Sequence, residues 1–187
     1  MKKLLLFLAL LGALPAVTNA KTAAIPQKME ALKWPAFRQI ASKKRTPEIK
    51  AIQYLLRSRG FYKAPIDGVF GAQTTKSVRA FQLKNGLKAD GIVAAQTFSK
   101  LIRTLKRGDK GDAVRALQTL LREPMAEDGT RPFERFSVDG VFGSGTDNLL
   151  RNYQREWVGY PETNVLKSDG IAGPKTWYYL FGGQLNY

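Results

Sequence analysis

The chain has 187 residues, of which 30 are Lys or Arg and 15 are Asp or Glu, giving a formal net charge of +15. It contains no Cys and no His, which excludes disulfide-stabilised domains, cysteine peptidases, histidine-based catalytic triads and the usual ligand set of a zinc enzyme. Any domain must therefore be stable through its own apolar core.

The first twenty residues have the order of a secretory signal. A basic start at Met1 to Lys3 precedes an apolar run from Leu4 to Leu14, and small residues end the segment at Ala20. The run is well short of the roughly 20 apolar residues that a spanning helix needs. We therefore predict a signal peptide at 1–20, no stable membrane span, and a secreted or periplasmic protein.

The positive charge is concentrated in the first half of the chain. Without Lys2 and Lys3 the net charge is 28 − 15 = +13; residues 21–107 hold 19 basic and 4 acidic residues, and residues 108–187 hold 9 and 11. Such a field concentrates an anionic partner near the first half. Outside a bacterial cell this partner would be an anionic wall polymer, a lipid head group or a stem-peptide carboxylate, and we expect no nucleic acid.

Residues 21–46 form a basic segment that matches nothing later in the chain. Pro26 and Pro35 interrupt it, although several apolar residues recur at roughly helical spacing, namely Met29, Leu32, Trp34, Phe37 and Ile40. We predict a linker that packs a few apolar side chains on the following domain. A membrane-surface helix is the weaker alternative, because such helices carry a longer uninterrupted apolar face.

The rest of the chain is an internal duplication. The pentapeptide DGVFG occurs at 67–71 and at 139–143, after AIQYLLR at 51–57 and ALQTLLR at 116–122. The matches continue in the same order through Thr74 and Thr146, the two Phe-Gln or Tyr-Gln pairs, the second DGI turns, and TFSKL against TWYYL. Matched motifs in one order predict two copies of one structural unit.

The first copy predicts three short helices. Thr46 and Pro47 suit the N-cap and first position of a helix that ends at Gly60. A second helix carries Val78, Phe81 and Leu83 on its apolar face and stops near 85–86, and a third spans 97–102. Asp-Gly turns separate the helices, and we expect Gly71 to serve a left-handed conformation or a close backbone approach.

The second copy has the same helices and two longer loops. Its first helix follows Asp112, which we expect to act as the N-cap. Seventeen residues separate Leu121 from Asp139 where the first copy has 10, and 14 separate Gln154 from Asp169 where it has 7. Each insertion is thus seven residues long and falls in a predicted loop, where added length costs little.

The predicted fold is all-α, with two tandem compact three-helix bundles at 47–104 and 105–183. The linked motifs resemble the small peptidoglycan-binding domain that is appended to many cell-wall hydrolases. The resemblance covers 47–101 and 105–180. The first copy departs from it at Ala94-Ala95, where the second has the more usual Gly173-Pro174, and the second copy departs more through its two insertions, which would reshape any groove that the family shares. It implies a non-catalytic module that attaches a protein to peptidoglycan, and hence a protein associated with the cell wall.

The shared motif is expected to define the fold and not a binding surface. Asp67 and Asp139 should accept hydrogen bonds from the amides of their own turns. Phe70 and Phe142 should fill the core, as should Trp177, which aligns with Phe98.

Candidate ligand contacts lie outside the motif, because sugars stack on aromatic rings at wet surfaces and cations pair with carboxylates. The aromatic candidates are Phe61, Tyr62, Trp157, Tyr160, Tyr178 and Tyr179. The basic candidates are Arg57, Arg59 and Lys63.

We predict no catalytic residue, no metal and no cofactor. Four carboxylates in the first insertion could in principle serve a glycosidase, but the segments outside the repeats are too short to form its cleft. These carboxylates are Glu123, Glu127, Asp128 and Glu134. The sequence favours a non-enzymatic protein that binds the glycan or stem peptide of peptidoglycan; the alternatives are an accessory protein that steers a separate wall hydrolase and a charge-driven binder of anionic wall polymers.

Overall fold

The computed structural model describes residues 33–39, 45–122, 136–156 and 166–183. Over these ranges all regular secondary structure is helical, and β-pairing is limited to isolated bridges, which confirms the all-α prediction. The helices are α2 (Pro47–Ser58), α3 (Ala72–Lys84), α4 (Ala95–Leu101), α5 (Asp112–Leu121), α6 (Ser144–Glu156) and α7 (Pro174–Leu180).

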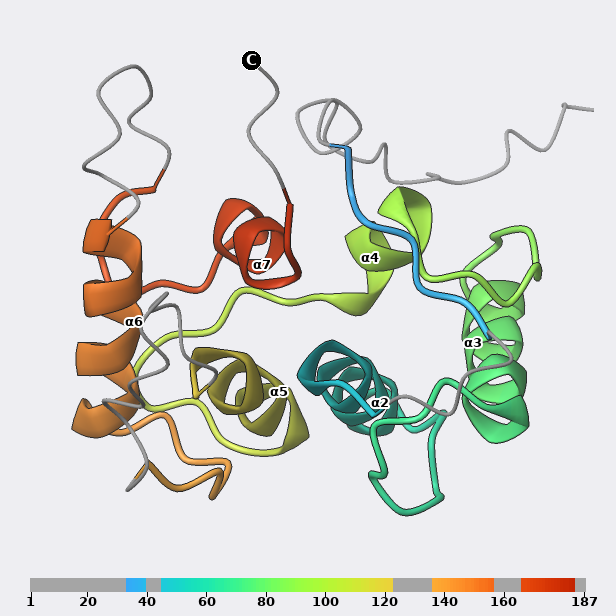
Figure 1. Cartoon of the computed structure of the whole chain (residues 1–187), viewed down its shortest axis with the longest axis horizontal. Coiled ribbons are helices and arrows are strands. Elements are labelled where there is room, and N and C mark those ends of the chain that lie inside the picture. The colour runs from blue at the N-terminus through green and yellow to red at the C-terminus, as the bar shows by residue number, and fades with distance from the viewer. Residues whose placement is uncertain (1–32, 40–44, 123–135, 157–165, 184–187) are drawn as a thin grey trace, which may run out of the picture.

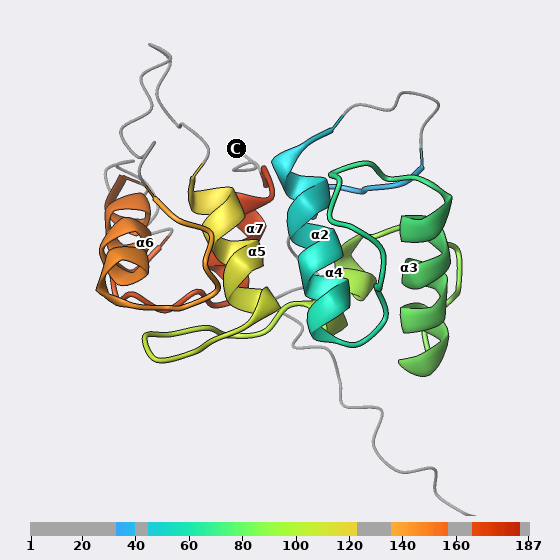
Figure 2. The ribbon, with the colours of Figure 1, turned by 90° about the horizontal axis from the view of Figure 1, so that it is seen from below.

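The two sequence copies meet through their first helices. Helices α2 and α5 lie side by side in the centre, α3 lies beyond α2, and α6 lies beyond α5 (Figure 1). Helices α4 and α7 cover the same side of the central pair, and the view turned by 90° gives the same order (Figure 2). Each helix of the first copy thus has a counterpart across the α2–α5 junction.

The first helix of each copy begins differently. At α2, Thr46 is the N-cap as predicted, and its hydroxyl oxygen accepts a hydrogen bond from the amide of Ile49 at 3.3 Å. At α5 the N-cap is Gly111, and Asp112 is the first residue of the helix, so the prediction that Asp112 is the N-cap is wrong. Its carboxylate instead pairs with arginines.

A buried glutamine on α2 fixes the turn that follows it. Gln53 Nε2 donates to Asp67 Oδ1 at 2.7 Å, to the Val69 carbonyl at 3.1 Å and to Thr74 Oγ1 at 3.2 Å. Gln53 Oε1 accepts from the amides of Asp67 and Gly68 at 3.1 and 3.0 Å. One side chain thereby ties α2, the Asp-Gly turn and the start of α3 together. We call this arrangement the glutamine clamp.

The glutamine clamp recurs at every Asp-Gly turn between helices in the described chain. In each case a Gln on the preceding helix bonds the Asp, the Gly amide, the carbonyl two residues after the Asp, and a Thr seven residues after it. The four Gln–Asp–Thr sets are Gln53–Asp67–Thr74, Gln82–Asp90–Thr97, Gln118–Asp139–Thr146 and Gln154–Asp169–Thr176. Each copy is therefore itself a double occurrence of helix, clamp and helix.

The turn glycine of the clamp needs a conformation that favours glycine. Gly140 has φ +80°, its amide donates to Gln118 Oε1 at 2.8 Å, and an added Cβ would lie 3.1 Å from the Gly111 carbonyl. Gly71, in contrast, has φ −94° and only ordinary contacts around an added Cβ. The prediction of a left-handed conformation or close approach at Gly71 is therefore wrong; the requirement lies three residues earlier, at Gly68, whose φ is +74°.

The core is continuous across the two copies. Phe98 of α4 lies 4.7 Å from Phe181, which follows α7, measured between ring centroids. Trp34 stacks on Phe98 at 4.6 Å and meets the edge of Tyr178 at 5.4 Å. Phe70, Phe142 and Trp177 are buried as predicted. The copies expected to form separate bundles thus share one hydrophobic core.

The described part of the basic segment belongs to this core. Phe37 forms an antiparallel bridge with Val93, and Leu105 forms the equivalent bridge with Ala172 in the second copy. Residues 33–39 therefore occupy, in the first copy, the place that the segment around Leu105 occupies in the second. Apolar packing on the first copy was expected; the contact of Trp34 with Tyr178 of α7 was not.

Two further predictions from the sequence concern Leu83 and the two insertions. Of the three apolar residues expected on the second helix, Val78 and Phe81 are buried in α3, whereas Leu83 is 69% exposed. Both seven-residue insertions lie largely outside the described residues.

One ion pair joins the central helices. Arg57 on α2 donates from Nε and one terminal nitrogen to the two carboxylate oxygens of Asp112, at 2.8 and 3.0 Å, and Arg115 donates to Asp112 Oδ1 at 3.0 Å. Burial acts to raise the pKa of Asp112, but the hydrogen bonds from both arginines outweigh it and hold that pKa below its usual value.

The pKa values of the clamp residues Asp90 and Asp139 are also lowered. The amide of Ile92 is the largest cause that lowers the pKa of Asp90, and Gln82 adds to it. The side-chain amide of Gln118 is the largest cause that lowers the pKa of Asp139. Because hydrogen bonds favour the charged form of each carboxyl, folding and deprotonation are linked.

Replacing Gln118 with Met should destabilise the fold. The variant keeps the side-chain volume but leaves the buried Gly140 amide without its acceptor and removes the donor to Asp139 Oδ1 and Thr146 Oγ1. We expect a loss of roughly 2–4 kcal/mol of unfolding free energy. Urea unfolding followed by circular dichroism measures this loss. Gln96→Met on the exposed side of α4 is the control, with a change below about 0.5 kcal/mol. Equal effects of the two substitutions would contradict the role of the clamp.

Acid should destabilise the protein through the same carboxylates. Their folded pKa values lie below the unfolded value of about 3.9, so the stabilisation is complete above that pH and is lost as pH falls through the folded pKa. We expect a urea midpoint that is flat above about pH 5 and decreases below about pH 4. Asp90→Asn/Asp139→Asn should be less stable at pH 7 and less sensitive to acid. Parallel acid profiles for parent and variant would refute this linkage.

Candidate functional site

A hollow of about 410 Å³ lies on the first copy, between α3 and the loop that leads from α2 to the first Asp-Gly turn. The loop contributes Phe61, Lys63 and Ala64. Helix α3 contributes Gln73, Lys76, Ser77 and Ala80, which recur on one side of the helix. Two of the ligand candidates named from the sequence, Phe61 and Lys63, are therefore brought together here.

The aromatic wall of the hollow is held in place by the core. Phe61 is half-buried, and its ring meets the ring of buried Phe81 edge-on, with centroids 5.4 Å apart. Lys63 and Lys76 are exposed and carry positive charge at the rim. A fixed ring beside two ammonium groups suits a ligand with both an apolar face and a carboxylate.

The corresponding place in the second copy is built differently. Phe136 stands where the first copy has Ala64, and Gly145 stands where it has Gln73. A Cβ added at Gly145 would lie 3.6 Å from the Phe136 ring. A side chain of the protein itself therefore lies against α6 in the second copy, at the place where the first copy is hollow.

Three of the other sequence candidates in the first copy are engaged within the fold. Tyr62 is 3% exposed, and its hydroxyl donates to the Pro65 carbonyl at 3.2 Å; burial raises the pKa of Tyr62. Arg57 is committed to the bidentate pair with Asp112. Arg59 donates to the carbonyls of residues 100, 101 and 102, and thereby caps the C-terminal end of α4.

The candidates in the second copy do not form a surface site within the described residues. Tyr178 and Tyr179 are 1% and 8% exposed, so their rings belong to the core and present no stacking face to solvent. Their pKa values are raised by burial. The pattern of aromatics near the end of α7 indicated a surface, but the shared core covers it. Trp157 and Tyr160 lie outside the described residues.

Gln73, Lys76 and Ser77 were not identified from the sequence. Their spacing of three and four residues on a helix with few apolar positions was the available signal, because such spacing places polar side chains together. No cluster of potential metal ligands occurs among the described side chains. None of the helices in the described ranges is long and apolar enough to cross a membrane.

Comparison with known proteins agrees with the helical fold. A family model for a putative peptidoglycan binding domain matches residues 45–101. The N-acetylmuramoyl-L-alanine amidase CwlM of Mycobacterium tuberculosis is 35% identical over 122 residues, which cover 60% of this chain and 27% of the amidase. A spore cortex-lytic enzyme of Bacillus cereus is 38% identical over 72 residues, 38% of this chain and 27% of that enzyme.

A probable N-acetylmuramoyl-L-alanine amidase of Bacillus licheniformis is 32% identical over 150 residues, 68% of this chain and 40% of the amidase. The chain thus spans between about a quarter and two fifths of the length of these relatives. No solved structure matches it significantly. Together, the matched family model and the wall-hydrolase relatives place the segment 45–101 of this protein in the family of peptidoglycan-binding domains.

Proposed function

We propose that the chain is an exported, non-catalytic protein that binds peptidoglycan through two tandem modules. The observation that carries the proposal is the hollow of Phe61, Lys63 and Lys76, which lies within the segment matched to the peptidoglycan-binding family. This segment is also in the strongly basic half of the chain. A wall ligand with sugar rings and free carboxylates fits such a surface.

The second copy supports the tandem part of the proposal. It repeats both glutamine clamps of the first copy, with the same Asp-to-Thr spacing of seven residues. The alignment with the mycobacterial amidase, at 122 residues, is longer than the segment 45–101. We therefore interpret 105–183 as a second module of the same kind, which differs from the first in its loops and its charge.

The amino-acid inventory supports the absence of catalysis. The full sequence offers no His and no Cys for a zinc site or a nucleophile–base pair. The relatives are named as amidases and cortex-lytic enzymes, but the chain spans less than half of each. The part they share with it includes the binding domain, so their hydrolytic activity is not transferred to this chain.

Binding by charge alone is the second candidate. Residues 21–107 carry 19 basic and 4 acidic residues, which is enough to attract an anionic wall polymer without a defined groove. The two candidates differ in salt dependence, because exposed charges separated by more than a Debye length are screened.

Purified protein lacking residues 1–20 should co-sediment with insoluble sacculi. As NaCl rises from about 50 mM to 1 M, we expect binding to weaken but to persist, because the Debye length falls to about 3 Å while stacking and hydrogen bonding remain. Protein that stays in the supernatant at low salt would refute peptidoglycan binding. Complete release near physiological salt would favour the charge-driven alternative. A parallel zymogram should show no lytic band; a band would refute the non-catalytic assignment.

The rim lysines provide a site-specific test. Lys63→Gln/Lys76→Gln should weaken the affinity for sacculi about tenfold, since charge-assisted hydrogen bonds to carboxylates are lost. Lys84→Gln/Lys106→Gln removes the same charge from exposed positions outside the hollow and should leave the affinity within about twofold. Thermal unfolding should be unchanged in both variants. If both pairs weaken binding equally, net charge and not the hollow controls the interaction.

A further inference from the structure

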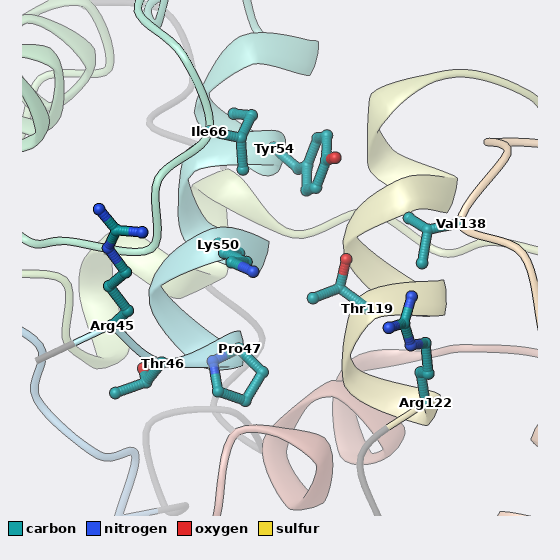
Figure 3. Close-up of a pocket in the computed structure, with 9 residues that line it drawn as sticks. All are labelled: Arg45, Thr46, Pro47, Lys50, Tyr54, Ile66, Thr119, Arg122 and Val138. Carbon is teal, nitrogen blue, oxygen red and sulfur yellow. The ribbon is translucent and has the colours of Figure 1, made fainter. Parts of the chain in front are cut away.

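A second pocket, of about 440 Å³, lies at the junction of the two copies (Figure 3). Helix α2 and the residues just before it line one side, and α5 lines the other. Three cationic residues contribute to the lining, namely Arg45, Lys50 and Arg122. The remaining lining residues are Thr46, Pro47, Tyr54, Ile66, Thr119 and Val138.

No carboxylate lines this pocket among the residues that the structure describes. Arg45 also lies close enough to Asp67 for its charge to help lower the pKa of that carboxyl. Lys50 and Arg122 have no ion-pair partner within the described ranges, and Glu48, in the first turn of α2, is not among the lining residues. Among the described residues, Lys50 and Arg122 therefore face a common space that holds no counter-ion.

At the other end of the α2–α5 pair, a carboxylate lies between two cations. There Asp112 sits between two arginines and receives three hydrogen bonds, two from Arg57 and one from Arg115. Asp112 belongs to α5 and Arg57 to α2, so this carboxylate crosses the junction. It is the internal counter-ion of that end.

The internal repeat relates the two ends position by position. Aligning Gln53 with Gln118 places Arg122 at the position of Arg57 and Lys50 at the position of Arg115. The contacts agree with this alignment: an added Cβ at Gly68 would meet Lys50, and one at Gly140 would meet Arg115.

The same alignment places Pro47 at the position of Asp112. Pro47 lines the pocket but carries no carboxylate. The pocket is thus the counterpart of the Arg57–Asp112–Arg115 cluster, and none of its described lining residues supplies the central anion.

We infer that this junction pocket binds a carboxylate of the wall stem peptide, held between Lys50 and Arg122 as Asp112 is held between Arg115 and Arg57. The inference rests on the proposed peptidoglycan binding and adds a site that neither copy could form alone. The pocket, at about 440 Å³, is larger than a carboxylate group needs. Ile66 and Val138 offer apolar surface for the short side chains of such a peptide, and Tyr54 offers a hydroxyl group. The Thr119 hydroxyl donates to the Arg115 carbonyl at 2.7 Å, so its oxygen is available only as an acceptor.

A carboxylate is favoured over a phosphate by the internal counterpart. The planar guanidinium of Arg57 binds both oxygens of Asp112 in a side-by-side pair, and Arg122 offers the same group at the corresponding position. A phosphodiester from a wall polymer would use the same cations, so the experiment must separate the two sources.

Arg122→Gln/Lys50→Gln is the direct test, with isothermal titration calorimetry on a soluble muropeptide that carries an intact stem peptide. We expect the dissociation constant to rise at least about tenfold. Amidation of the free carboxylates of the muropeptide should weaken binding to the parent protein by a similar factor. Lys84→Gln/Arg107→Gln, which removes two charges elsewhere, is the matched control and should retain the parent affinity.

Pro47→Asp tests the inference by supplying a carboxylate from the protein itself. It places a carboxylate at the position equivalent to Asp112 and at the start of a helix, where an acidic residue is favourable. We expect a higher melting temperature together with at least about tenfold weaker muropeptide binding. A stabilised protein that still binds at the parent affinity would overturn the inference, as would a variant in which both properties are unchanged.

The outcomes separate the site from the general function. If the parent protein fails to sediment with sacculi, peptidoglycan binding itself is refuted. If Arg122→Gln/Lys50→Gln still sediments and still binds the muropeptide as the parent does, only the junction site is refuted. If amidation has no effect while a soluble glycerol-phosphate polymer competes for the pocket, the ligand is a phosphate and the carboxylate assignment is wrong.

Discussion

The glutamine clamp is the constraint on which the rest of the structure depends. Every helix of the described chain either carries the glutamine of a clamp or begins with the threonine side of one, and α3 and α6 do both. Short helices are unstable in isolation, and here each connection except that between α4 and α5 is fixed by buried hydrogen bonds to a glutamine side chain. The Asp-Gly turn is thus part of the interior scaffold, and loops of different length can be attached ahead of it without altering the helices.

The two copies are also joined into one core and are not merely adjacent. The α2–α5 contact, the Arg57–Asp112 pair and the rings of Trp34, Phe98 and Phe181 join them into one core. Fusion explains why Tyr178 is unavailable to a ligand and why a pocket exists at the junction. The site candidates are accordingly of two kinds: a hollow within one copy, and a pocket that needs both.

Most of the fold followed from local sequence signals, and less of the site did. Helix type, the Thr46 cap and the buried aromatics could be predicted because they depend on nearby residues and on apolar periodicity. Gln53 and its counterparts were missed because a lone glutamine on a helix resembles a surface residue until its distant turn is in place. Tyr62, Tyr178 and Tyr179 were assigned to the surface because only tertiary structure shows what covers them. Phe61 and Lys63, an aromatic and a cation just after a helix end, do line the hollow, and their contact with a ligand stays a prediction.

The shared core also determines how the molecule can engage an extended polymer. Two modules on a flexible tether search for their ligands independently, and their avidity depends on tether length. Here the Arg57–Asp112 pair and the contact of Phe98 with Phe181 join the two copies, so the hollow and the junction belong to one folded body. Under the proposed function, such a body favours strands whose repeating groups match the distance between its two sites. Strands without that spacing gain no affinity from a second contact.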